Sequence, residues 1–158
     1  MPAMTNFMEL AFSQAEAASA RGEVPVGAVL VAANGEILAR AGNHAEELSD
    51  PTAHAEMLVL RETCHKLASP RLPDCDLYVT LEPCAMCAAA ISFARIRRVI
   101  YAAYDPKGGA IDHGPRFFEQ PTCHHAPETL GGLSPADECR SAEMLKRFFE
   151  GKRRNAAP

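Results

Sequence analysis

The chain has 158 residues, a mass of 17.0 kDa, 47% hydrophobic and 23% charged residues, and a formal net charge of −4. These proportions are those of one ordinary globular domain, and they exclude a disordered chain, a collagen and a coiled coil. No run of about 18 apolar residues occurs, and the N-terminal stretch through Leu10 has no basic side chain, so we expect no transmembrane helix, no secretory signal and a cytoplasmic location.

Periodicity and turn signals predict helices and strands that alternate along the chain after an initial hairpin. The predicted helices are Thr5–Ala20, His54–Ala68, Cys84–Ala94 and Pro135–Phe149, and the predicted strands are Val26–Ala32, Ile37–Ala41, Leu77–Leu81, Arg98–Ala103 and Glu128–Leu130. This order predicts an α/β sheet with helices on both faces. Residues 1–150 would form a single domain, and residues 151–158 a frayed basic tail.

Charge is distributed unevenly along the sequence. Residues 1–79 hold 5 basic and 11 acidic side chains, a net charge of −6, whereas residues 80–158 hold 11 and 9, a net charge of +2. The segment Arg140–Arg154 has six basic side chains against Glu143 and Glu150. Two interpretations stay open from charge alone, a basic binding patch and an ordinary solvated helix face.

Two short motifs each stand at the start of a predicted helix. The first is His54-Ala55-Glu56, and the second is Pro83-Cys84-Ala85-Met86-Cys87. Cys84 and Cys87 are three residues apart, so their sulfurs share one helix face, and a helix N-terminus favours the thiolate form that binds metal. The sequence has no second Cys-x-x-Cys pair, which excludes a zinc ribbon built from two such pairs.

A further ligand must come from the histidines, and His54 is the best candidate because it too starts a helix. Residues two apart in a helix point in different directions, so His54 and Glu56 can reach one site only if His54 lies where the helix begins. Three protein ligands with an open fourth position are typical of catalytic zinc, which lowers the pKa of its bound water toward ~7. Glu56 would then carry protons. The alternative is two helix-capping cysteines beside an ordinary surface glutamate.

The other cysteines are expected to be reduced structural thiols, because the chain is larger than disulfide-dependent domains and shows no export signal. They are Cys64, Cys75, Cys123 and Cys139. Cys123-His124-His125 could suggest a second metal site, but it lacks a fourth ligand and the usual zinc spacing. Contact of His124 or His125 with a phosphate or a base is the better interpretation.

The combination of H-x-E with P-C-x-x-C is the signature of zinc-dependent nucleobase deaminases. Beyond these motifs, the chain resembles the bacterial tRNA-specific adenosine deaminases, of the cytidine/deoxycytidylate deaminase superfamily, over most of its length. The zinc motifs indicate only the superfamily, whereas Asp105–Ala110 and Phe148-Phe149 with its basic tail are similar to the tRNA-acting members. The matching blocks are Glu23–Val31, Asn43, Asp50–Glu56, Leu77–Ala90, Arg95–Val99, Asp105–Ala110, Asp137–Cys139 and Phe148–Phe149.

The resemblance implies a cytidine-deaminase-like three-layer α/β/α fold with a five-stranded mixed sheet, and a homodimer. It also implies hydrolysis of adenosine to inosine, with release of ammonia, at the wobble position of the tRNA anticodon stem-loop. One zinc ion per chain would lie on His54, Cys84 and Cys87, with Glu56 as the proton shuttle. Asn43 and Val26 would line the base pocket, and Asp105, Lys107 and Phe149 would contact flanking nucleotides.

Two surfaces are expected to serve assembly and RNA binding. The apolar, alanine-rich helix Cys84–Ala94, with Phe93 and Ile96, is expected to pack partly at a two-fold interface. Positive charge is expected to gather where RNA phosphates lie, with Phe148 and Phe149 adding aromatic surface. The basic residues of that surface are Lys107, Arg116, Lys146, Arg147, Lys152, Arg153 and Arg154.

Departures from the family pattern and competing functions bear on the substrate. Asp112–Gln120 differs from the pattern, and Leu133–Pro135 is longer by about one residue, which affects the RNA-facing loop and leaves the metal motifs untouched. One alternative is a small-molecule deaminase of guanine or cytosine, which would need no basic C-terminal surface. The other is a non-catalytic zinc module, against which Glu56 argues, because a closed structural site needs no general base.

Overall fold

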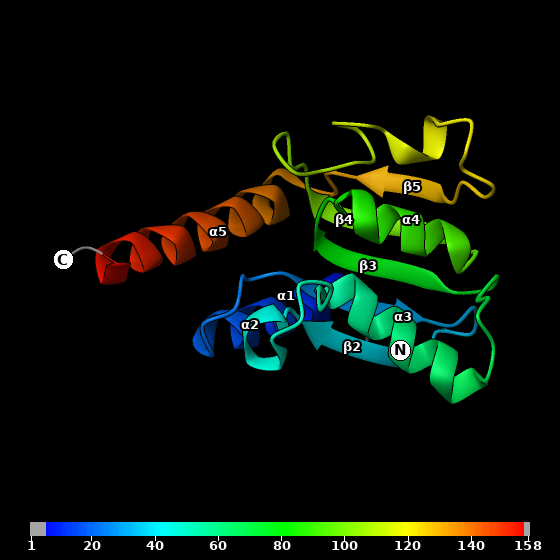
Figure 1. Ribbon diagram of the computed structural model, residues 1–158, viewed down its shortest axis with the longest axis horizontal. Helices are drawn as coiled ribbons and strands as arrows, with labels where there is room; N and C mark the ends of the chain where they lie inside the picture. Colours follow the sequence, from blue (N-terminus) through cyan, green and yellow to red (C-terminus); the bar gives the residue numbers. More distant parts are fainter. Residues whose placement is uncertain (1–5, 157–158) are drawn as a thin grey trace, which may run out of the picture.

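Residues 6–156 are described by the computed structural model, and their strands form a five-stranded sheet in the order β2-β1-β3-β4-β5 (Figure 1). β1 pairs antiparallel with β2 and with β3, whereas β3, β4 and β5 run parallel, which confirms the predicted mixed sheet. The strands are β1 (Gly27–Val31), β2 (Ile37–Gly42), β3 (Asp76–Leu81), β4 (Arg98–Ala103) and β5 (Glu128–Gly131).

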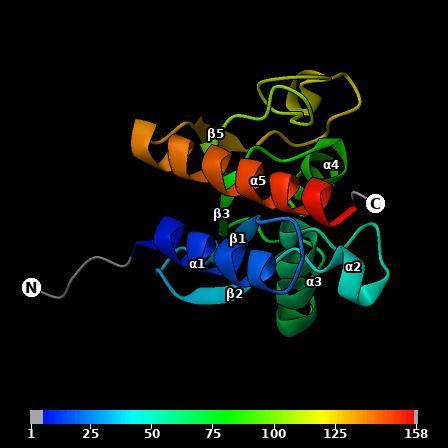
Figure 2. The same cartoon turned by 90° about the vertical axis from the view of Figure 1, so that its left-hand side faces the viewer.

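Helices cover both faces of the sheet, as the three-layer expectation required. α1 (Phe7–Ala20) and α5 (Pro135–Ala156) lie side by side over one face, and α3 (Ala55–Leu67) and α4 (Ala85–Phe93) cover the other (Figures 1 and 2). Successive strand residues point to opposite faces, so Val29 packs under α1 while Leu30 packs under α3 and α4. The remaining elements are the short α2 (Ala45–Leu48) and the 3₁₀ turn η1 (Phe117–Glu119).

Both helices that carry the metal motifs begin one residue later than predicted. His54 and Cys84 are the N-cap residues, with extended backbone (φ −74°, ψ 153° and φ −74°, ψ 175°), and the helices start at Ala55 and Ala85. The first helix of the chain likewise starts at Phe7, capped by Asn6, and its predicted first residue, Thr5, lies outside the described residues. The cap positions matter because the backbone of an N-cap residue is not helical, so its side chain can lie beside that of a residue in the first helical turn.

The helix α2 was not predicted, and a long-range contact explains why. The buried carboxylate of Glu23 accepts the N–H groups of Glu46 (3.0 Å) and Glu47 (2.9 Å) from 23 and 24 residues further along the chain. These bonds satisfy helix N-terminal donors that a local cap residue would otherwise satisfy. His44, the residue at the N-cap, makes no side-chain cap bond.

The expectation of a frayed tail from Gly151 is wrong for the residues that are described. α5 continues through Gly151 to Ala156, and residues 157–158 lie outside the described part. Arg153 and Arg154 in the last turn favour the helix electrostatically, because cations stabilise a helix C-terminus. Within residues 6–156, no helix combines the length and apolar character that a membrane crossing requires.

Candidate metal and catalytic site

Three metal-binding side chains meet where α3 and α4 begin. His54 caps α3, Cys84 caps α4, and Cys87 lies in the first turn of α4. His54 Nδ1 lies 3.7 Å from Cys84 Sγ and 3.6 Å from Cys87 Sγ. Within residues 6–156 these three form the one group of at least three candidate ligands close enough to share a metal ion, with all ligand atoms within 4.8 Å.

The distances fit a tetrahedral zinc ion. Zn–S and Zn–N bonds of about 2.3 and 2.0 Å at a tetrahedral angle place sulfur and nitrogen about 3.5 Å apart, close to the separations found here. Two thiolates and one imidazole are a usual zinc donor set, and three protein ligands leave a fourth position open. The condition set by the sequence, that His54 stand where its helix begins, is therefore met.

The protonation of the two thiols also favours a cation at this place. Hydrogen bonds from Cys87 and then from His54 lower the pKa of Cys84 to about 4, so its sulfur is a thiolate at neutral pH. The same sulfur–sulfur contact, together with burial, raises the pKa of Cys87, which keeps the shared proton. The hydrogen bond with Cys84 in turn raises the pKa of His54. A divalent cation would displace these protons and hold both sulfurs as thiolates.

Glu56 lies beside this group and has unused hydrogen-bonding capacity. Its side chain is buried in the first turn of α3, and its Oε1 has no hydrogen-bond partner among the described residues. Burial raises the pKa of its carboxyl group above the ordinary value. A buried carboxyl group that lines a cavity and keeps one oxygen without a partner is suited to exchange protons with a ligand there.

The cavity next to these residues has a volume of about 210 Å³. That is smaller than the ~300–1,000 Å³ of pockets for drug-sized ligands, and it suits a single heterocyclic base. The predicted pocket residues Val26 and Asn43 both line it, together with His54, Glu56 and Cys84. Asp105, which was expected to contact a flanking nucleotide, also lines it. The lining residues that were not predicted are Val24, Leu81, Glu82 and Gly108.

Asn43 also links the cavity to α3. Its Oδ1 accepts the N–H of Ala55 at 2.8 Å, one of the donors that a helix N-terminus leaves free. Because a backbone N–H can only donate, the contact fixes the orientation of the amide, and its NH₂ group stays available to a ligand. Asn43 therefore helps to hold the helix that carries Glu56 and presents a donor to the cavity.

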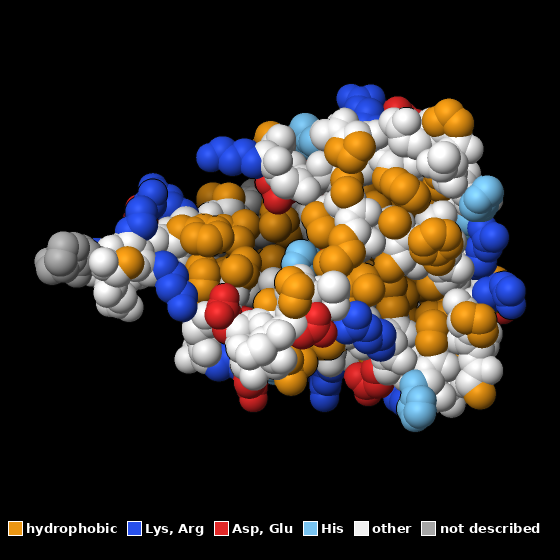
Figure 3. All heavy atoms as spheres, viewed as in Figure 1, with side chains coloured by type: hydrophobic (Ala, Val, Ile, Leu, Met, Phe, Trp, Pro, Cys, Tyr) orange, Lys and Arg blue, Asp and Glu red, His pale blue; other side chains and the backbone are white. Residues whose placement is uncertain are grey.

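The predicted RNA contacts are divided among different places. Asp105 lines the cavity of about 210 Å³ beside His54 and Glu56, which is called the catalytic cavity below. It also lines a second, adjacent cavity of about 530 Å³, and Lys107 lines this second cavity too. This second cavity, the α5 groove, lies between the Tyr104–Lys107 segment and the α5 residues Glu138, Ala142 and Leu145, where Figure 3 shows a hollow lined with apolar side chains. Phe149 lines neither cavity and stands on α5 with 48% of its surface exposed.

The basic residues of the predicted RNA surface and of the Arg140–Arg154 segment are not equally available. Arg140 is bound to Glu9 (2.7 Å) and Glu16 (2.8 Å) and joins α5 to α1. Arg147 is paired with Glu143, and Arg116 with Glu119. Within residues 6–156 no ion pair involves the members that remain, which are Lys107, Lys146, Lys152, Arg153 and Arg154.

The ring of His125 makes a hydrogen bond within the chain. Its Nε2 lies 2.8 Å from the carbonyl oxygen of Ile96, and its own carbonyl accepts the hydroxyl of Ser92 at 2.6 Å. Cys123 Sγ contacts the same carbonyl, so this segment is fastened to the end of α4. The expectation that His125 contacts a phosphate or base is therefore not supported, whereas His124 is exposed.

Comparison with known proteins identifies a family with a similar sequence. Residues 1–103 match the family model of the cytidine and deoxycytidylate deaminase zinc-binding region. The chain is 60% identical over 153 residues to the tRNA-specific adenosine deaminase of Agrobacterium fabrum, an alignment that covers 97% of this chain and 98% of that one.

Solved structures place two relatives at different distances. One structure comes from studies of A-to-I editing by tRNA deaminases at the wobble position of transfer RNA. It is 60% identical in sequence and has a TM-score of 0.83, and the match covers 88% of this chain and 98% of that chain. A guanine deaminase from Bacillus subtilis is 30% identical with a TM-score of 0.61 and covers 96% of this chain and 93% of its own.

Proposed function

The chain belongs to the cytidine and deoxycytidylate deaminase family, and within it we propose that the protein hydrolyses adenosine to inosine at the wobble position of tRNA. The observation that carries the proposal is one cavity lined by His54 and Cys84 of the His54–Cys84–Cys87 group and by Glu56, whose Oε1 has no hydrogen-bond partner. The sequence identity is 60% to a tRNA-specific adenosine deaminase and 30% to a guanine deaminase, and this difference supports the choice of substrate. A tRNA substrate would place the enzyme in the cytoplasm.

The chemistry assigns separate tasks to the residues of the cavity. His54, Cys84 and Cys87 would hold zinc, which when bound lowers the pKa of a water molecule toward ~7 and so supplies a nucleophile. Glu56 takes one proton from the attacking water and delivers it to N1 of adenine. It then takes the remaining proton from the new C6 hydroxyl group and passes it to the amino group on C6. A C6–O bond forms, the C6–N bond breaks and ammonia leaves, with no change in oxidation state.

The rest of the binding surface would orient the nucleotide. The free NH₂ of Asn43 donates to an acceptor on the base, and Val26 packs against the ring. The nucleotide beside the target base lies against Asp105 and Lys107 in the α5 groove. Phe149 is exposed for stacking, while Phe148 packs under the Lys152 ammonium group at 5.4 Å.

Assays of several substrates in parallel test the proposed function. We expect the protein to convert adenosine in an anticodon stem-loop, measured as inosine by mass spectrometry, and to leave free guanine, cytosine and adenosine nearly untouched. A stem-loop with the adenosine moved one position from the wobble site is the matched control. Faster release of ammonia from guanine or cytosine than from the stem-loop would favour the small-molecule alternative.

The unpaired charges at the end of α5 are expected to contribute to RNA affinity. An Arg153→Ala/Arg154→Ala protein should bind the stem-loop more weakly. The slope of log K for binding against log salt concentration should become less negative by roughly 0.7–0.9 for each phosphate that is no longer neutralised. Zinc content should not change. The control is Arg40→Ala/Arg71→Ala, which removes the same charge from exposed positions away from both cavities. Equal affinity and equal salt slope in the two double variants would exclude Arg153 and Arg154 as RNA contacts.

An apolar surface over α3 and α4 supports a homodimer. A groove of about 300 Å³ between α3 and α4, the α3–α4 groove, is lined mostly by apolar side chains, and Figure 3 shows apolar atoms gathered over these helices. Phe93 lies in it with 70% of its surface exposed. Ile96, which was also expected at the interface, is fully buried in the core of its own chain, so that part of the prediction is wrong. A second copy of the chain is the proposed occupant.

Sedimentation tests the dimer. At micromolar concentration the wild-type protein should sediment at twice 17.0 kDa, and Phe93→Asp should shift it to the monomer, because a charge in a desolvated interface is costly. Leu48→Asp, at another exposed apolar position outside the α3–α4 groove, should remain dimeric. A wild-type monomer under these conditions would contradict the proposal.

A further inference from the structure

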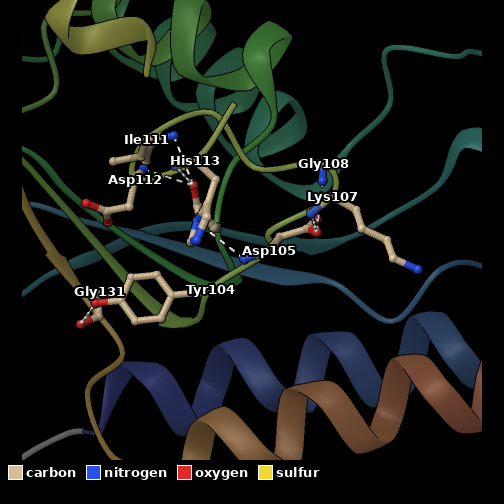
Figure 4. Close-up of polar contacts among 9 residues, drawn as sticks. Tyr104, Asp105, Lys107, Gly108, Ile111, Asp112, His113 and Gly131 are labelled. Atoms are coloured by element: carbon tan, nitrogen blue, oxygen red, sulfur yellow. Dashed lines mark hydrogen bonds and ion pairs between the residues drawn. The ribbon is translucent and has the colours of Figure 1, made fainter. Parts of the chain in front are cut away.

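The buried carboxylate of Glu82 is not used by the proposed chemistry, yet it is densely hydrogen-bonded. Glu82 follows β3 and precedes Cys84 by two residues, and its side chain is fully buried. One oxygen accepts the N–H of Asp105 (3.0 Å) and Nδ1 of His113 (2.8 Å). The other accepts the N–H groups of Ile111 (3.1 Å), Asp112 (3.0 Å) and His113 (3.2 Å) (Figure 4). Every one of these partners belongs to a single loop.

That loop, Asp105–His113, is held almost entirely by Glu82 and by its own first residue. Four backbone N–H groups of the loop donate to Glu82. Those of Lys107, Gly108 and Gly109 donate to Asp105, and that of Ala110 donates to the carbonyl of Pro83. Pro106 has no N–H. Every backbone donor of the loop is thus satisfied, and Glu82 supplies the acceptor for half of them.

The residues around Glu82 are suited to a loop that wraps around its carboxylate. A Cβ at Gly109 would overlap the Glu82 carboxylate, so the loop can wrap around the carboxylate only with glycine at this position. The His113 ring, bonded to Glu82, also meets Tyr104 edge to face at 5.7 Å, and the Tyr104 hydroxyl donates to the carbonyl of Gly131 on β5 (Figure 4). The loop is therefore connected through His113 and Tyr104 to the edge of the sheet.

The same loop forms part of the binding surface. Asp105, Gly108 and Glu82 itself line the catalytic cavity, and Asp105 and Lys107 line the α5 groove. The chain therefore places one buried carboxylate between the segment that carries the cysteine ligands and the segment that would face RNA. Movement of the loop would alter both cavities without displacing any proposed metal ligand.

We propose that Glu82, assisted by His113, is a positioning residue that sets the shape of the Asp105–His113 loop for substrate RNA. The inference rests on the proposed function and deepens it. His113, whose Nδ1 lies 2.8 Å from a Glu82 carboxylate oxygen, adds a side-chain contact to the backbone hydrogen bonds that anchor the loop. Glu82 acts through the loop and takes no part in proton transfer to the base.

Glu82→Gln is the first test, because an amide replaces one acceptor oxygen, to which backbone N–H groups donate, by an NH₂ group that cannot accept them. We expect faster amide exchange in peptides that cover Asp105–His113, and unchanged exchange in β4. The KM for the stem-loop should rise roughly 10–100-fold, as for other residues that support a site, with kcat within about threefold and one zinc per chain.

Gly109→Ala is the second test, because its Cβ separates the loop from the Glu82 carboxylate while the segment that carries Glu82 and Cys84 keeps its sequence. It should reproduce the faster exchange and the higher KM. Asp112→Ala is the matched control, since the Asp112 side chain is exposed and its backbone N–H is retained. It should behave as the wild type in exchange, KM and kcat. If Glu82→Gln loses its zinc, the comparison of Gly109→Ala with Asp112→Ala decides the outcome.

Two kinds of failure are distinguishable because the wild-type enzyme is measured first. No turnover of the stem-loop by wild-type protein would overturn the proposed function. Wild-type turnover with an unchanged KM in both Glu82→Gln and Gly109→Ala would overturn the positioning role alone, whether or not the loop exchanges faster. A fall in kcat at constant KM would also overturn it, because that result would place Glu82 in the chemical step.

Discussion

A Glu56→Ala protein is expected to keep one zinc per chain and to lose nearly all turnover. Glu56 supplies no metal ligand, so elemental analysis should find the wild-type zinc content. General acid–base groups are typically worth ~10²–10⁴-fold, and Glu56 serves several proton transfers in one turnover, so we expect a loss at the upper end of that range. Single-turnover formation of inosine in the stem-loop measures the chemical step separately from product release.

Two further variants make this result specific. Glu56→Gln keeps the size of the side chain and removes its ability to exchange protons, so it should be as inactive as Glu56→Ala. Glu62→Gln, at an exposed position of the same helix, makes the same chemical change and should be fully active. Activity of Glu56→Gln within about threefold of wild type would remove Glu56 from the proton-transfer role.

The metal site was predictable because its information is local in the sequence. Cys84 and Cys87 are neighbours on one helical turn, and the spacing of His54 and Glu56 had a stated geometric condition that the N-cap position of His54 meets. The continuous apolar runs of β1 and β4 similarly encode a sheet with two covered faces. Such patterns need no knowledge of distant contacts.

The features that sequence reasoning missed depend on contacts between distant segments. Glu23 caps α2 from more than 20 residues away, and Glu82 reaches residues up to 31 positions later, so no spacing rule predicts either contact. The only signal for Glu82 was its place between a predicted strand and the Pro83-Cys84 motif. Arg140 was counted among the basic residues of the C-terminal segment, but its two acidic partners lie on α1.

Cys87→Ala is expected to abolish stable zinc binding. Cys87 is fully buried and lies 3.6 Å from His54 Nδ1, and its loss leaves two protein ligands for the metal. Partners that merely support a metal ligand are worth roughly 10–100-fold in metal affinity, so removal of a ligand itself should cost at least about 100-fold. Elemental analysis after dialysis against a weak chelator should find far less than one zinc per chain, and inosine formation should fall in proportion.

The thermal stability of the same variant separates loss of metal from loss of packing. Zinc bound only by the folded chain stabilises it by mass action, so adding zinc should raise the Tm of apo wild-type protein and leave that of Cys87→Ala almost unchanged. Cys139→Ala, which removes an exposed thiol on α5, should respond to zinc as the wild type does. A wild-type zinc content in Cys87→Ala would exclude Cys87 as a ligand, and the site would then have to bind its metal through His54 and Cys84 with a group from elsewhere.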